Sequence, residues 1–162
     1  MKSACFTGHR NIPNDYEELS GRLYSFVECG IINLGLTDFY TGGAIGWDTL
    51  AAQTILRLRN DYPHIRLNLV LPCSSIEQTA KWNQTQKDEY MRILSQADRI
   101  EYTSKHYFNG CMRLRNARLV ELATERCYCY WNGNRKQSGT FQTICLARTK
   151  GIMVVNFCRN FN

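Results

Sequence analysis

Hydrophobic and polar positions alternate between two periodicities along the chain. Short runs compatible with β-strands occur at residues 3–7, 38–41, 67–71, 99–102, 127–131 and 152–155. Between them, apolar residues recur every three to four positions, as on one face of a helix, in segments 19–27, 51–58, 90–97, 112–123 and 140–150. Strands that alternate with helices form βαβ units, whose right-handed crossovers place helices on both faces of a sheet. We therefore predict a single doubly wound α/β domain over residues 1–162, with a largely parallel sheet.

Polar and glycine residues indicate the ends of the first helix. Asn14 and Glu17 have the spacing of a capping box, which predicts that the helix begins after Asn14. Gly30 follows the last apolar position of this segment, so we expect the helix to end there.

The composition is that of a globular protein, with 44% hydrophobic and 21% charged residues and 3 prolines. No apolar run reaches the roughly 20 residues that a membrane-spanning helix needs, and the first residues lack the apolar segment of a signal peptide. We therefore expect a cytoplasmic protein that does not contact membranes. Its oligomeric state, including a homo-oligomer, is left open by the sequence.

Eight cysteines are scattered at positions 5, 29, 73, 111, 127, 129, 145 and 158. They form no CxxC pair and lack the spacing of zinc ligands, which argues against a zinc finger or a disulfide scaffold. In a reducing compartment we expect them to be small buried hydrophobic residues. The sequence predicts neither a metal site nor a cofactor.

Twenty basic residues against fourteen acidic ones give a net charge of +6. Such an excess favours an anionic partner, either a nucleic acid or a phosphorylated small molecule. The basic residues gather locally at Arg113, Arg115 and Arg118. A solvated basic surface is the alternative explanation for this cluster.

Glycine-bearing loops follow several of the predicted strands and open the next helix. Ligands of doubly wound sheets bind beyond the carboxyl ends of the strands, near the point where the strand order reverses. Glycine allows close backbone approach, and the free N–H groups at a helix start attract anions. We therefore predict a phosphate-binding site formed by Gly8, Gly42, Gly43, Gly46, Ser138, Gly139 and Thr140.

Two arginines and two further polar residues complete the predicted binding site. Arg10 and Arg115 are expected to bind phosphate, because a guanidinium group contacts phosphate oxygens in a bidentate way. Asn116 lies beside Arg115 in the sequence. The alternative for either arginine is an ion pair with a surface carboxylate. Asp48 is expected either to cap backbone N–H groups at a helix start or to accept hydrogen bonds from ribose hydroxyls.

Catalysis, if the chain is an enzyme, would rest on Asp48, His9 or Arg115. Imidazole is a common proton-transfer group, but a lone histidine beside a strand end is more often structural. Trp82 lies in the long segment before the third predicted helix, where an indole ring can stack on a base. Packing against the rest of the domain is its alternative role.

The ordered set of these motifs resembles the SLOG superfamily, and specifically its YpsA-like branch. The motifs are Thr7-Gly8-His9-Arg10, the run from Thr41 to Asp48, Pro72-Cys73 with Gln78 and Trp82, Tyr90 with Ala97-Asp98, Met112-x-x-Arg115-Asn116, Trp131-Asn132-Gly133 and Ser138-Gly139-Thr140. The resemblance implies a Rossmann-like domain that binds a nucleotide or a nucleotide derivative, as a sensor or binding module.

The same superfamily implies two alternatives. Proteins of the cytokinin-activating "lonely guy" type hydrolyse the N-glycosidic bond of nucleoside monophosphates, with an Arg in Met-x-x-Arg and a Glu in Gly-Thr-x-x-Glu. Here Arg115 matches the arginine, but Thr143 stands at the glutamate position and lacks the charge that stabilises an oxocarbenium-like transition state. A nucleotide N-glycosidase, or phosphoribohydrolase, is therefore the first alternative. The second is binding of single-stranded nucleic acid, as in DprA proteins, through Arg113, Arg118, Tyr107 and Phe108.

Overall fold

The computed structural model describes residues 1–12, 15–136 and 138–159 of the chain. Its strands form one parallel sheet with the order β4-β3-β2-β1-β5-β6. The strands are β1 (Lys2–Gly8), β2 (Leu36–Thr41), β3 (Arg66–Leu71), β4 (Arg99–Tyr102), β5 (Arg126–Tyr130) and β6 (Met153–Asn156). The strand order reverses between β1 and β5, as in a Rossmann-like fold. The predicted α/β fold class is confirmed.

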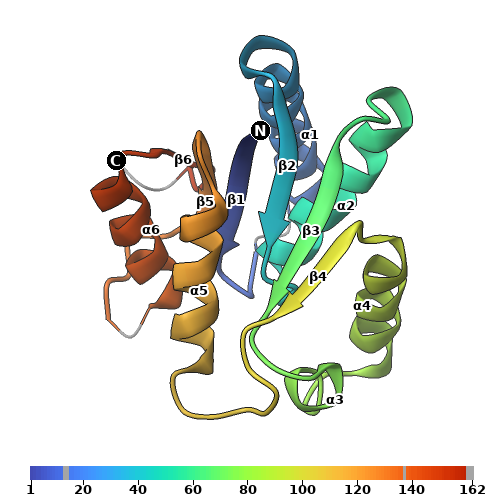
Figure 1. Ribbon diagram of the computed structural model, residues 1–162, viewed down its shortest axis with the longest axis vertical. Helices are drawn as coiled ribbons and strands as arrows, with labels where there is room; N and C mark the ends of the chain where they lie inside the picture. The colour runs from blue at the N-terminus through green and yellow to red at the C-terminus, as the bar shows by residue number, and fades with distance from the viewer. Residues whose placement is uncertain (13–14, 137, 160–162) are drawn as a thin grey trace.

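Helices cover both faces of the sheet (Figure 1). On one face lie α1 (Tyr16–Cys29), α2 (Trp47–Asp61) and α4 (Gln84–Gln96), and on the other α5 (Cys111–Leu122) and α6 (Gly139–Lys150). A short helix α3 (Ser75–Gln78), which the hydrophobic pattern did not predict, precedes α4. None of the described helices is long and apolar enough to cross a membrane.

Neighbouring residues of the central strand supply both halves of the core. Phe6 packs with the residues beneath α1 and α2, whereas Cys5 belongs to the cluster beneath α5 and α6. Successive side chains of a strand point to opposite faces of the sheet, which explains this division. The aromatic stack of Phe6 on Tyr128, with ring centroids 5.6 Å apart, joins β1 to β5 at the reversal of the strand order.

The cysteines follow the expectation of burial with two exceptions. Cys5, Cys73, Cys111, Cys127, Cys129 and Cys158 are buried, whereas Cys29 and Cys145 are exposed. The expectation was wrong for these two, because they lie on the sides of α1 and α6 that face solvent.

The first α-helix ends where its sequence indicated, at Cys29 with Gly30 as the capping residue, but the chain does not leave the helical path there. Gly30 has right-handed helical dihedral angles, and the chain continues into a π-helical turn, η1 (Gly30–Leu34). The left-handed conformation that closes this turn occurs at Gly35, with φ of 72°. Gly30 therefore ends the α-helix as predicted, but Gly35 is the glycine whose left-handed backbone ends the helical path. Asn14, the predicted cap, lies outside the described residues.

Candidate functional site

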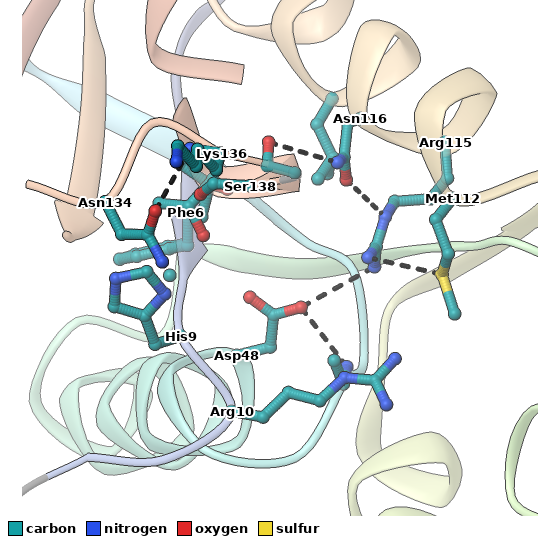
Figure 2. Close-up of a pocket in the computed structure, with 16 residues that line it drawn as sticks. Phe6, His9, Arg10, Asp48, Met112, Arg115, Asn116, Asn134, Lys136 and Ser138 are labelled. Atoms are coloured by element: carbon teal, nitrogen blue, oxygen red, sulfur yellow. Dashed lines mark hydrogen bonds and ion pairs between the residues drawn. The ribbon is translucent and has the colours of Figure 1, made fainter. Parts of the chain in front are cut away.

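A cavity of about 400 Å³ lies at the carboxyl edge of the sheet, where the strand order reverses. Its volume falls in the range of roughly 300–1,000 Å³ that is typical of small-molecule sites. Nine of the residues predicted to bind a ligand or to act in catalysis line it: Gly8, His9, Arg10, Asp48, Arg115, Asn116, Ser138, Gly139 and Thr140. Phe6, Thr7, Ala44, Met112, Leu119, Asn134 and Lys136 complete the lining. These segments come from β1, α2, α5 and the start of α6, far apart in the sequence (Figure 2).

The loop after β1 is held between β5 and the start of α2. The N–H of His9 donates to the Tyr130 carbonyl, and the His9 carbonyl accepts from the N–H of Trp47, both at 3.2 Å. Gly46 has φ of 80°, and a Cβ atom there would lie 2.2 Å from the carbonyl oxygen of Arg10. Gly46 is therefore needed so that α2 can begin directly against the backbone that carries Arg10.

Gly42 and Gly43 shape the site without lining the cavity. The Gly42 carbonyl accepts a hydrogen bond of 2.6 Å from Nη1 of Arg115, and a Cβ atom at Gly42 would lie 1.5 Å from that nitrogen. At Gly43 a Cβ atom would lie 2.6 Å from Cδ2 of Leu71. These glycines, like Gly46, accommodate other parts of the protein, whereas the sequence had suggested that their backbone approaches a phosphate.

Asp48 and Arg115 form a buried ion pair on one wall of the cavity. Oδ2 of Asp48 lies 3.5 Å from Nη1 of Arg115, and the side chains are 7% and 8% exposed. The same oxygen accepts a hydrogen bond of 3.2 Å from the N–H of Ala44. Burial raises the pKa of the Asp48 carboxyl above its usual value, against the opposing effect of Arg115. Burial likewise lowers the pKa of Arg115.

The Arg115 guanidinium is connected to the start of α6 through its neighbour. Its Nε donates to Oδ1 of Asn116 at 2.7 Å, and Nδ2 of Asn116 donates to the Gly139 carbonyl at 3.4 Å. Among the described residues, the one hydrogen-bond acceptor of Nη2 of Arg115 is the sulfur of Met112, at 3.8 Å. Because a thioether is a weak acceptor, this nitrogen retains donor capacity for a further partner. Figure 2 shows Arg115 between Asp48, Met112 and Asn116.

The first turn of α6 presents free backbone donors to the cavity. Ser138 caps the helix, since its hydroxyl accepts from the N–H of Phe141 at 3.1 Å. Among the described residues, no acceptor contacts the N–H groups of Gly139 and Thr140. These two groups lie at the positive end of the helix dipole and are suited to bind an anion.

Thr143 does not line the cavity. Its side chain is fully buried, and its hydroxyl donates to the Gly139 carbonyl at 2.8 Å. Thr143 stands where the resemblance places a catalytic glutamate, but its hydrogen bond to Gly139 stabilises the first turn of α6. Among the described residues that line the cavity, Asp48 is the only one with a carboxylate.

His9 organises the loop between β5 and α6. Its Nε2 accepts from the N–H of Asn132 at 3.1 Å, and the Asn132 side-chain oxygen accepts from the N–H of Asn134 at 3.1 Å. The Asn134 side-chain oxygen in turn accepts from the N–H of Lys136 at 3.0 Å. This series of contacts gives His9 a structural role and brings Lys136 to the rim of the cavity (Figure 2). Sequence reasoning missed Lys136 and Asn134, although a basic residue just before a helix cap was a usable signal.

Trp82 lies outside the cavity. Its ring meets the ring of Tyr90 edge-on, with centroids 5.5 Å apart, and packs against the core beneath α2 and α4. The packing alternative therefore describes Trp82 in this structure.

The residues considered for nucleic-acid binding also lie outside the cavity lining. Arg118 is engaged in ion pairs with Glu101 at 2.7 Å and Glu121 at 2.9 Å. Tyr107 and Phe108 are exposed in the loop between β4 and α5, and Arg113 is exposed on α5. Among the residues that the structure describes, no three His, Cys, Asp or Glu side chains gather as metal ligands would.

Comparison with known proteins identifies the family. Residues 19–151 match the model of the YspA SLOG family, YpsA. The chain belongs to this family. Two UPF0398 proteins are similar to it: one from Halalkalibacterium halodurans is 30% identical over 93 residues, 56% of this chain and 48% of that protein. The other, from Brevibacillus brevis, is 33% identical over 72 residues, 44% of this chain and 37% of that protein. This YpsA-family chain thus matches half or less of the length of each of these two proteins.

A solved structure has the same fold. DNA processing protein A from Helicobacter pylori, described for its single-stranded DNA binding mode, superposes with a TM-score of 0.65. The two are 18% identical, and the match covers 96% of this YpsA-family chain and 64% of the other. At this identity the similarity establishes the fold that the two proteins share.

Proposed function

We propose that the cavity binds a nucleotide or a nucleotide derivative through its phosphate. The observation that carries this proposal is the charge of the lining. Three cationic side chains, from Arg10, Arg115 and Lys136, face one cavity that contains a single carboxylate among its described residues. This positive excess suits a phosphate group, which carries up to two negative charges at neutral pH.

The arrangement of donors supports phosphate binding on the side of α6. Gly139 and Thr140, whose N–H groups begin α6, line the cavity on that side together with Lys136. Arg10 approaches from the loop after β1, where its side chain is exposed and forms no ion pair with any described residue. Because neither Arg10 nor Lys136 is engaged in an ion pair, both are available to a ligand.

A nucleotide N-glycosidase is the second candidate function. The observation in its favour is the carboxylate of Asp48, which is buried at the cavity wall with a raised pKa. Such a group can stabilise positive charge on a sugar or activate water. Release of free base from nucleoside monophosphates by the wild-type protein, lost in Asp48→Asn, would favour this function over binding alone.

Removing the Arg10 charge tests the proposal with a matched control. We expect Arg10→Gln to weaken the binding of nucleoside 5′-monophosphates by about tenfold or more, because a charge-assisted hydrogen bond is lost. Arg99→Gln removes the same charge from an exposed position at the start of β4, at the opposite edge of the sheet. Calorimetric titration should show unchanged affinity in that control. Equal effects of the two substitutions would contradict a phosphate site at Arg10.

A further inference from the structure

The two carboxylate oxygens of Asp48 have different surroundings. Oδ2 makes the contacts to the Ala44 N–H and to Arg115. A backbone contact from Gly42 to the carboxylate lowers the pKa of Asp48 and does not outweigh the effect of burial. No hydrogen bond of 3.5 Å or shorter reaches Oδ1 among the described residues, where every fully buried side-chain oxygen or nitrogen has a partner. Oδ1 is therefore accessible from the cavity that Asp48 lines. Figure 2 shows it directed away from Arg115, toward the side of the cavity where His9 and Ser138 lie.

An ionised carboxylate facing an anion site restricts what can bind beside it. Asp48 can only accept hydrogen bonds in this state, and it repels a phosphate group placed against it. The phosphate is therefore held by Arg10, Lys136 and the first N–H groups of α6, while Asp48 faces a neutral part of the ligand that donates hydrogen bonds. In a nucleotide, the hydroxyls of the ribose are the donors attached closest to the phosphate.

We propose that Oδ1 of Asp48 accepts hydrogen bonds from the 2′- and 3′-hydroxyls of a ribose and makes the cavity selective for ribonucleotides over 2′-deoxyribonucleotides. This inference rests on the proposed function, because the phosphate brings the sugar to Asp48. It adds a specificity-determining role to a residue that also anchors Arg115. A 2′-deoxy ligand lacks one of the two donors, so the carboxylate loses one charge-assisted hydrogen bond and the ligand binds more weakly.

Two matched pairs of ligands test the inference on the wild-type protein. The pairs are AMP with 2′-deoxy-AMP, and ribose 5-phosphate with 2-deoxyribose 5-phosphate, titrated by calorimetry. We expect the ribo member of each pair to bind about tenfold more tightly. Equal affinity within the pairs would overturn the role of Asp48 and leave phosphate binding intact. Failure of all four compounds to bind the folded protein would instead overturn the proposed function.

Two variants separate sugar recognition from general loss of affinity. Arg10→Gln should weaken both members of a pair and preserve their ratio. Asp48→Asn should reduce the ratio towards one, because an amide is a weaker acceptor than a carboxylate. A thermal melt must show that Asp48→Asn is folded, since Arg115 loses its counter-charge. An unchanged ratio in the folded Asp48→Asn protein would overturn the inference.

Discussion

Replacing Arg115 by methionine is expected to lower the free energy of unfolding by about 3–5 kcal/mol, the usual cost of leaving one member of a buried ion pair without its partner. Arg115 and Asp48 are both more than nine-tenths buried. The substitution also removes the hydrogen bonds to the Gly42 carbonyl and to Asn116. Urea unfolding, followed by circular dichroism, measures the loss.

The control is Arg118→Met, on the same helix. Arg118 forms two ion pairs, but its side chain is 34% exposed, and exposed pairs contribute about 1 kcal/mol or less. Combining Arg115→Met with Asp48→Asn should recover part of the lost stability, because no uncompensated charge then remains. Similar losses for Arg115→Met and Arg118→Met would contradict the importance assigned to the buried pair.

Replacing Gly46 by alanine is expected to lower the free energy of unfolding by about 3 kcal/mol or more, because strain and a backbone clash add. Gly46 has φ of 80° and ψ of −119°, a region that residues with a Cβ atom rarely occupy. The added Cβ atom would also lie 2.2 Å from the Arg10 carbonyl oxygen, which is backbone and cannot move aside without its loop.

Gly151→Ala is the matched control. Gly151 has φ of 82°, and a Cβ atom there meets nothing within 4 Å. Gly151→Ala should therefore lower the free energy of unfolding only by the cost of a left-handed backbone at alanine, about 1–2 kcal/mol. A thermal melt and a urea titration of both variants give the comparison. If both variants lose the same stability, the close approach of Arg10 to Gly46 has no energetic consequence, and the account of this loop is wrong.

The location of the cavity could be predicted from the sequence because it follows from topology. Alternating strand and helix periodicities indicate a parallel sheet, and the ends of its strands meet at one edge. Arg10, Asp48 and Ser138 each lie just after a strand or at the start of a helix, so local position placed them near one another. The structure brings all three to the same cavity.

The roles of several residues could not be predicted, because they depend on partners far away in the sequence. Gly42 is required by Arg115, which is 73 positions away, and Gly46 by the backbone of Arg10. Thr143 shares the first turns of α6 with Thr140, but its hydroxyl turns to the Gly139 carbonyl and away from the cavity. Such directions follow from packing between elements, which periodicity does not specify.

The central claim is that the cavity recognises a phosphate group, and one comparison tests it most directly. Wild-type protein is titrated by calorimetry with the four common nucleoside 5′-monophosphates and with the corresponding nucleosides, with inorganic phosphate as competitor. The account predicts that at least one nucleotide binds, that its nucleoside binds about tenfold or more weakly, and that phosphate competes. Equal binding of a nucleotide and its nucleoside would contradict the claim. So would a protein that binds none of these compounds but binds a single-stranded oligonucleotide tightly and in a salt-dependent way.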